Sequence, residues 1–174
     1  MCARRHRKNS TTATSTEHIG CRPVTDGEIP AVHRLIREVF TTQVAPLYSE
    51  EGVRSFLDYI DPDQLARRTG RDHELIAAED DGTGDILGVA EVRRCTHIAL
   101  LFVRAEVQRA GIGRKLLEHV CSRCRSRGRR ILTVNAAPNA VSAYEHLGFK
   151  AQGAEHEESG IRSVPMMRAV DESP

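Results

Sequence analysis

Residues 101–117 read LFVRAEVQRAGIGRKLL: an apolar strand, a loop and the first turns of an amphipathic helix. Gly111 and Gly113 carry no side chains where the helix begins, so a ligand can approach the backbone there. The N–H groups at a helix N-terminus suit an anion. Three cations crowd the same end: Arg109, Arg114 and Lys115. Each costs about 0.3–1 kcal/mol against the helix dipole. A bound polyphosphate would reverse that cost, so the stretch predicts an anion site.

The glycine pattern differs from two common phosphate-binding motifs. No Gly-Lys-Ser/Thr follows it, so it is not a P-loop. Leu116 replaces the third glycine of a dinucleotide-binding fingerprint, and the preceding loop is long. Two glycines alone fit a plain helix start with a solvated basic face equally well. That interpretation stays open beside the anion site.

Helices and strands alternate on both sides of this stretch. Apolar spacing and turn residues predict, in chain order, a strand at 21–24, helices over 28–40 and 49–60 (the second ended by Pro62), strands at 74–78, 86–92 and 96–103, a helix over 113–127, a strand at 131–134, a short helix over 138–147, and strands at 149–157 and 161–169. The order β-α-α-β-β-β-α-β-α-β-β predicts an α/β (α+β) domain, with a mixed sheet covered by helices on both faces.

Composition narrows the class of protein. The 174 residues carry a net charge of +1, with 40% hydrophobic and 28% charged residues. Aromatic residues make up only 4%, and Trp is absent. This balance predicts a soluble domain without a nucleic-acid partner. The sequence contains no run of eighteen apolar residues, so we expect no membrane-spanning helix. Five cysteines form an odd set, which favours a reducing cytoplasm.

The chain ends differ in composition from the rest. Residues 1–8 are basic and residues 9–17 are mostly Ser and Thr, without the apolar core of a signal peptide. We therefore expect a disordered basic tail over 1–18, one domain over 19–170 and a short tail over 171–174.

Two motifs together resemble those of the GNAT superfamily of N-acetyltransferases. Gln108-x-x-Gly111-x-Gly113 after an apolar strand resembles its Q/R-x-x-G-x-G/A acetyl-CoA motif. The block 134–149, with Tyr144 before Leu-Gly-Phe, resembles its closing segment, and residues 160–167 resemble one bacterial branch. The resemblance implies the GNAT fold: a central mixed, mostly antiparallel sheet with a splayed pair of parallel strands.

The resemblance also implies a place for acetyl-CoA, the co-substrate, without a metal. The pantetheine arm would pair with the backbone of Leu101, Phe102 and Val103. The pyrophosphate would rest on backbone N–H groups of the loop and the helix start: Gln108, Arg109, Ala110, Gly111, Ile112, Gly113 and Arg114. Asn135 and Tyr144 would lie near the thioester, although Asn135 alternatively caps the following helix.

The implied chemistry is attack of a neutral amine on the acetyl thioester. The Leu101 N–H would stabilise the oxyanion. Tyr144 would act as the acid for the leaving thiolate, since a phenol of pKa about 10 stays protonated at neutral pH. Glu91 is the predicted base and His97 a second candidate. The alternatives are a packing role for Tyr144, a solvent-facing Glu91 and a hydrogen-bonded strand-end His97.

The acceptor is the least defined part of the prediction. Acidic residues gather at two places, Asp58, Asp61 and Asp63, and Glu155, Glu157 and Glu158. Either they attract a cationic amine, on a small molecule or a protein, or they are solvated surface. For the oligomeric state, the sequence is equally compatible with a monomer and with a homodimer. A non-catalytic acyl-CoA sensor and a nucleotide-binding protein of another class are the competing functions.

Two further clusters have plainer interpretations. Cys121-x-x-Cys124 has metal or redox spacing, but both cysteines fall on the apolar face of a helix, which favours the core. The arginines between Arg123 and Arg130 form either a solvated face or a contact with the adenosine 3′-phosphate.

Overall fold

An eight-stranded sheet forms the middle layer of the structure, a computed structural model that describes residues 18–171. Its strands are β1 (Ile19–Pro23), β2 (His73–Asp80), β3 (Ile86–Arg93), β4 (His97–Val103), β5 (Ile131–Ala136), β6 (Lys150–Ala151), β7 (His156–Glu158) and β8 (Ile161–Ala169). They lie in the order β1-β2-β3-β4-β5-β8-β6, with β7 also beside β8. Within this part of the chain only β4 and β5 pair in parallel. The predicted mixed, mostly antiparallel sheet is therefore confirmed, and the predicted tails lie almost wholly outside the described residues.

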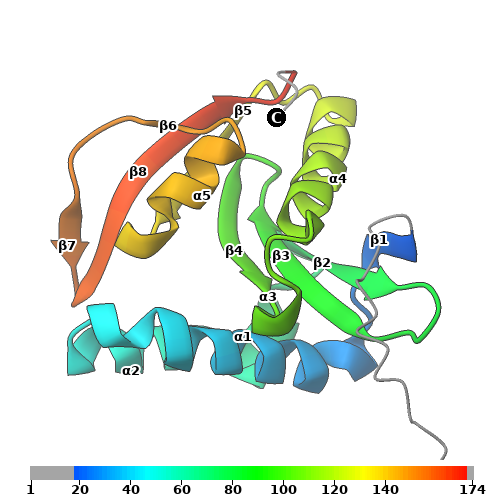
Figure 1. The fold of residues 1–174 in the computed structure, drawn as a ribbon, viewed down its shortest axis with the longest axis horizontal. Helices are drawn as coiled ribbons and strands as arrows, with labels where there is room; N and C mark the ends of the chain where they lie inside the picture. The colour runs from blue at the N-terminus through cyan, green and yellow to red at the C-terminus, as the bar shows by residue number, and fades with distance from the viewer. Residues whose placement is uncertain (1–17, 172–174) are drawn as a thin grey trace, which may run out of the picture.

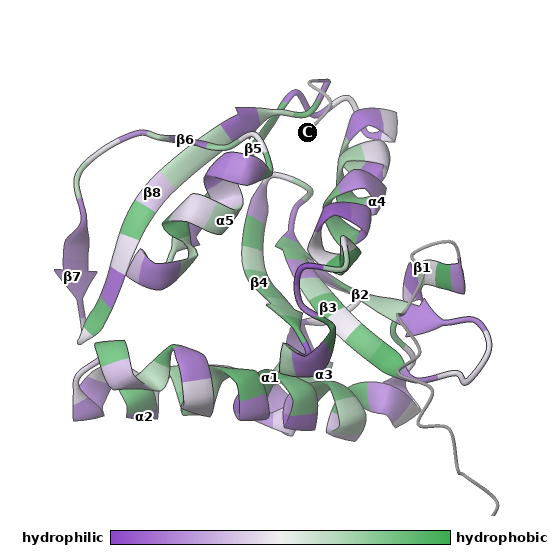
Figure 2. Ribbon diagram, in the orientation of Figure 1, coloured by the Kyte–Doolittle hydropathy of each residue, from purple (hydrophilic) through white to green (hydrophobic). Residues whose placement is uncertain are grey.

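Helices cover both faces of the sheet (Figure 1). They are α1 (Ile29–Gln43), α2 (Glu50–Tyr59), α3 (Pro62–Arg68), α4 (Ile112–Ser126) and α5 (Val141–His146). One apolar core lies under α1–α3 and includes Val89 and Leu100; a second lies under α4 and α5 and includes Ile98 and Val134. Figure 2 shows the apolar residues concentrated on β3, β4 and the inner helix faces. Burial of these two faces is what holds the three layers together.

The sheet opens between β4 and β5. These strands pair at only two positions, His97 with Thr133 and Ile98 with Val134, and then separate. On the other side of β4, Val92 lies opposite Ile98 but Glu91 lies opposite Leu100, so one residue of β4 is extra. Such a β-bulge bends the strand. The gap between the two strands therefore begins at the bulge, which contains Ala99.

Pro62 does more than follow the end of the second predicted helix. Pro62 does follow α2, but it also occupies the first turn of α3, which was not predicted. Proline suits that position because the first helical N–H groups have no partner within the helix. Asp61 caps the new helix, accepting hydrogen bonds from the N–H groups of Asp63 and Gln64.

The predicted strand at 149–157 is two short strands, β6 and β7. Both pair with β8, on either side of Pro165. Proline has no N–H to donate to a neighbouring strand. The Pro165 carbonyl still accepts from the Gln152 N–H at 2.8 Å. The interruption therefore falls where β8 cannot donate a ladder bond.

The turn between β7 and β8 packs on the start of α2. Gly52 and Gly160 approach so closely that a Cβ on Gly52 would collide with the Gly160 carbonyl. The Ser49 N–H donates to that carbonyl at 3.3 Å. This contact joins the C-terminal hairpin to α2 on the α1–α3 side of the gap (Figure 1).

Candidate active site

A cavity of about 700 Å³ lies where the end of β4, the start of α4, the end of α1 and α5 meet. Its lining comprises Val39, Gln43, Val44, Leu101, Phe102, Val103, Gln108, Arg109, Gly111, Ile112, Gly113, Arg114, Asn139, Ala140, Ala143, Tyr144, His146 and Leu147. The size is within the usual range of small-ligand sites. None of these lining residues is acidic, whereas Arg109 and Arg114 are basic. The cavity is therefore suited to an anion.

The loop before α4 turns its backbone toward this cavity. Arg109 has φ = 66° and Gly111 has φ = 82°, both left-handed. Alternation of this kind can direct successive N–H groups to one side and form an anion-binding nest. The first helical bond runs from the Lys115 N–H to the Gly111 carbonyl at 3.0 Å. The N–H groups of Ile112 and Gly113 therefore have no carbonyl partner within the helix.

Gln108 fastens the loop to its surroundings. Its Nε2 donates to the Val103 carbonyl at 3.0 Å and to Gln43 Oε1 at 3.1 Å. The Gln43 carbonyl in turn accepts from Asn139 Nδ2 at 2.7 Å. The last residue of α1 thus bridges the loop before α4 and the segment before α5. Sequence reasoning missed Gln43 and Asn139, because the apolar pattern of α1 ends at Phe40 and no local motif marks either residue.

Beyond Ile98, the edge of β4 that faces the gap has no partner strand among residues 18–171. The Arg104 N–H donates to the Leu87 carbonyl of the β3 side at 2.9 Å. Backbone groups of alternate residues point to the same side of a strand, so those of Phe102 also face β3. Those of Leu101 and Val103 face the gap, where β5 has moved away. Leu101 therefore presents its N–H where the resemblance expects the oxyanion donor.

Tyr144 lies on α5 with its ring in the core. The residue is 8% exposed, and its ring meets that of Phe149 edge-on, with centroids 5.3 Å apart. Burial raises the pKa of the phenol above its ordinary value. No described residue accepts or donates a hydrogen bond at its hydroxyl, yet the residue lines the cavity. The structure therefore combines a packing ring with an available, protonated hydroxyl.

Glu91 does not face the cavity or the solvent. Its side chain is fully buried on the α1–α3 side of β3. Arg68 donates to both carboxylate oxygens, at 2.5 and 3.0 Å, and His73 Nδ1 lies 2.8 Å from Oε1. The Tyr59 hydroxyl lies 3.5 Å from Oε2. These four side chains, Tyr59, Arg68, His73 and Glu91, are called the Glu91 cluster below. The solvent-facing alternative for Glu91 is wrong.

Two of the predicted cofactor residues stand apart from the cavity lining. Asn135 is exposed on β5, opposite Pro165 of β8. The alternative capping role for Asn135 is wrong, because Ala137 is the N-cap of the helical turn that follows. Ala110 is half-buried within the loop, and its N–H donates to the Val107 carbonyl at 3.4 Å.

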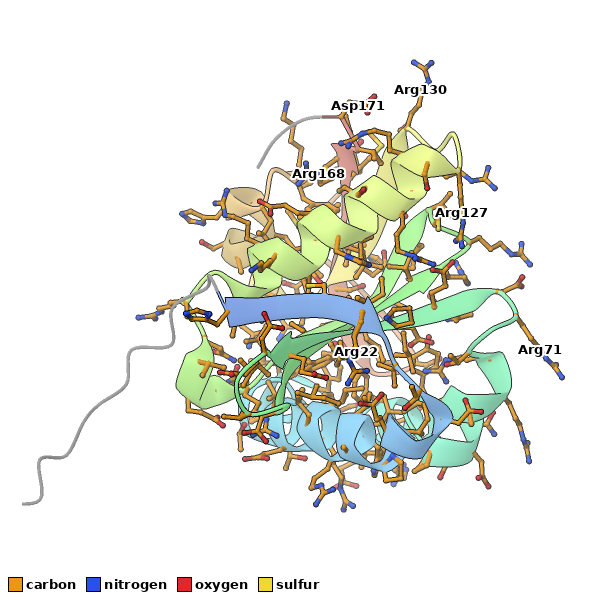
Figure 3. All side chains as sticks on the ribbon, turned by 90° about the vertical axis from the view of Figure 1, so that its right-hand side faces the viewer. Arg22, Arg71, Arg127, Arg130, Arg168 and Asp171 are labelled. Carbon is orange, nitrogen blue, oxygen red and sulfur yellow. The ribbon has the colours of Figure 1, made fainter. Side chains whose placement is uncertain are left out.

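The arginine cluster lies at the opposite end of α4 from the loop that contains Gly111 (Figure 3). Arg123 and Arg127 both pair with Glu74, and Arg125 pairs with Asp171. A helix of 15 residues is about 22 Å long. These ion pairs favour the solvated-face interpretation of the cluster, and its contact with an adenosine 3′-phosphate stays a prediction.

The other sequence features have structural roles in the described part of the chain. Cys121 and Cys124 are buried in the core under α4. Asp61 caps α3, and Glu155 pairs with Arg162 at 2.5 Å.

No group of three or more metal-ligating side chains occurs among residues 18–171. None of the helices there is both long and apolar enough to cross a membrane.

Comparison with known proteins agrees with this geometry. Residues 44–170 match the family model described as the acetyltransferase (GNAT) domain. No curated protein sequence matches the chain. A GCN5-related N-acetyltransferase from Rhodopseudomonas palustris superposes with a TM-score of 0.74 at 21% identity, over 86% of this chain and 94% of the other.

Two other solved structures carry ligands. The PaiA N-acetyltransferase of Thermoplasma acidophilum, in complex with coenzyme A, has a TM-score of 0.72 and 19% identity over 87% of this chain and 98% of its own. The spermidine N-acetyltransferase of Vibrio cholerae, in complex with CoA and spermine, has a TM-score of 0.65 and 17% identity over 88% and 96%. These likenesses show the fold, and the family model covers most of the chain. The chain therefore belongs to the GNAT family of acetyltransferases.

Proposed function

We propose that this protein transfers the acetyl group of acetyl-CoA to a primary amine by direct attack. The observation that carries the proposal is the cavity, whose lining contains no Asp or Glu. It extends from the backbone nest at Arg109 and Gly111 to the open edge of β4. A nest suits the diphosphate, and an open strand edge suits the amides of pantetheine. One cavity thus matches the two chemically different parts of a single long ligand.

The diphosphate would lie on the loop and helix start, from Gln108 to Arg114. Backbone N–H groups, including those of Ile112 and Gly113, would provide most of the contacts. The guanidinium of Arg109, which has no acidic partner within residues 18–171, would add charge. The pantetheine would run along Leu101, Phe102 and Val103 toward the bulge, and Asn135 would approach its thioester end from β5.

Catalysis would use groups on both sides of that thioester. The Leu101 N–H would stabilise the developing oxyanion. Tyr144 would give its proton to the departing thiolate, because burial keeps the phenol neutral at working pH and no described residue occupies its hydroxyl. Loss of such an acid typically costs 10²–10⁴-fold in rate.

Glu91 stays a proposal as the base, and its surroundings weigh against a direct role. The Glu91 side chain is fully buried, and Arg68 and His73 already contact its carboxylate oxygens, so a substrate amine has no open approach to it. We favour a positioning role, in which Glu91 holds α3 and His73 against the sheet.

A small amine is the proposed acceptor. The Vibrio cholerae relative is a spermidine N-acetyltransferase, and its structure contains spermine. In this chain Asp58, Asp61, Asp63, Glu155, Glu157 and Glu158 are all exposed. An acidic surface would attract a cationic amine at long range.

The test is an assay of the purified protein with acetyl-CoA and a panel of primary amines, in which the release of free CoA thiol is followed. Tyr144→Phe should lower kcat about 100-fold and leave the Kd for CoA unchanged. Tyr48→Phe is the matched control and should behave as the wild type. Binding of CoA without thiol release from any amine would instead identify a non-catalytic acyl-CoA sensor. Unchanged turnover of Tyr144→Phe would refute the acid role alone.

A further inference from the structure

The Glu91 cluster leaves the amine without an obvious proton acceptor, and a different side chain, His97, lies at the closed end of the gap. We propose that His97 accepts the proton of the attacking amine, through one bridging water, on the α1–α3 side of the sheet. This inference rests on the proposed acetyl transfer and adds a catalytic residue to it.

The position of His97 follows from the register of β4. His97 pairs with Thr133 at the closed end of the gap, two residues before the bulged Ala99. Ile98 points into the α4–α5 core, so its neighbour His97 points to the opposite face, toward α1–α3. A strand rises about 3.3 Å per residue, so His97 and Leu101 are about 13 Å apart along β4. That interval is too long for direct proton transfer from an amine near Leu101, so the proposal includes a bridging water.

The proposal includes an assignment of the proton on the His97 ring from the contacts of Thr133. The Thr133 hydroxyl has one proton to donate and lies 3.1 Å from the Thr96 carbonyl and 2.9 Å from His97 Nδ1. We assign that proton to the Thr96 carbonyl, so that the hydroxyl oxygen accepts from His97 Nδ1. Neutral His97 thus carries its proton on Nδ1, and Nε2 keeps its lone pair.

Nε2 of His97 is also accessible. Within residues 18–171, the one buried side-chain nitrogen or oxygen without a hydrogen-bond partner is His119 Nε2. His97 Nε2 has no hydrogen-bond partner among the described residues either, so it keeps contact with solvent. A lone pair that is directed by a neighbour and open to water is what a general base requires.

The charge environment keeps His97 neutral. Burial lowers the pKa of its imidazole, and Arg93 and His73 lower it further. These groups face His97 from β3 and β2, since Arg93 lies opposite both His97 and His73. The folded pKa is therefore below the ordinary 6.5. The base is present at neutral pH and is lost as the pH falls through that lowered pKa.

The proton balance is complete with these groups. The amine nitrogen forms a bond to the acetyl carbon, and the carbon–sulfur bond breaks. The amine proton passes through water to His97 Nε2, and Tyr144 supplies a proton to the thiolate. His97 then releases its extra proton to solvent, and solvent restores the proton of Tyr144. Because Tyr144 belongs to the α4–α5 core and His97 to the other face, the two transfers occur on opposite sides of the sheet.

The tautomer gives a test that needs no substrate. Two-dimensional ¹⁵N NMR of the histidine side chains in the full-length protein, near pH 7.5, should show His97 protonated at Nδ1. Thr133→Val, which removes the acceptor, should shift His97 toward the Nε2-protonated form. Nε2 protonation in the wild type would overturn the inference, whatever the enzyme assay shows.

The kinetic test separates a base from a structural histidine. His97→Asn keeps a donor for Thr133 but has no basic nitrogen, and it should lower kcat about 100-fold without changing the Kd for CoA. The acid limb of the wild-type pH profile should disappear in this variant, and added imidazole should restore part of the rate. His33→Asn, on α1, is the control and should match the wild type.

The outcomes distinguish this inference from the proposed function. A wild type that releases thiol, together with a His97→Asn variant within threefold of it, would overturn the base assignment and leave acetyl transfer intact. A wild type that acetylates no amine would refute both.

Discussion

The phosphate loop and the Glu91 cluster are both polar regions beside β4, but they are built in opposite ways. The loop is a continuous segment, Gln108–Gly113, in which Gln108, Arg109 and Gly111 are exposed. It offers backbone N–H groups beside Arg109, which pairs with no acidic side chain among residues 18–171. The Glu91 cluster brings together side chains from α2, α3, β2 and β3 around the buried Glu91 carboxylate, whose charge Arg68 neutralises. Arg109 of the loop is therefore open to pair with an anionic ligand. In the Glu91 cluster the charges of Arg68 and Glu91 pair with each other, which suits a structural role.

The largest effect is expected from breaking the cluster. Arg68→Met would leave the buried Glu91 carboxylate without its main partner, so the free energy of unfolding should fall by about 3–5 kcal/mol. Urea denaturation measures this directly. Adding Glu91→Met to the same chain should recover most of the loss, because no buried charge then remains. A single-variant loss below about 1 kcal/mol would show that the cluster is solvated in solution and not closed.

Substitution within the loop should act on binding instead of stability. Gly111→Asp places a side chain and a negative charge in the nest, at a left-handed φ. The affinity for CoA should fall at least 100-fold in calorimetry. Gly128→Asp is the matched control, because Gly128 also has a left-handed φ, of 70°, but lies beyond the C-terminal end of α4. Equal losses in both variants would mean that the effect is general strain.

The smallest effect is expected from a single loop cation. Arg109→Gln removes one exposed charge from the cavity and should weaken CoA binding about tenfold, or about 1.4 kcal/mol. The difference should shrink as salt rises from 50 to about 500 mM, because exposed charges are screened. Arg129→Gln, an exposed arginine near the other end of α4, should leave the affinity unchanged. An equal loss from Arg129→Gln would point to net charge and not to the site.

Local patterns explain why the loop was predictable from sequence. The spacing of Gln108, Gly111 and Gly113 lies within six residues, and the cavity does gather these residues with Arg109, Arg114 and Tyr144. The fold was predictable for a similar reason, since the helical and strand periods of residues 29–43 and 86–103 are each set within one element.

Contacts between distant segments explain what the sequence did not reveal. Glu91 looked like an ordinary strand carboxylate because its partners, Tyr59, Arg68 and His73, lie 18 to 32 residues away. The helix α3 was missed because it begins at Pro62, and a proline is compatible both with the end of one helix and with the first turn of the next. The role of Gln43 depends on Gln108, 65 residues away.

The central claim is that a cationic backbone nest holds the diphosphate of coenzyme A. Calorimetry on the wild-type protein with CoA and with pantetheine, which lacks every phosphate, tests it most directly. The account predicts saturable binding of CoA and at least 100-fold weaker binding of pantetheine. No uptake of CoA by folded protein, or equal affinity for the two ligands, would contradict it.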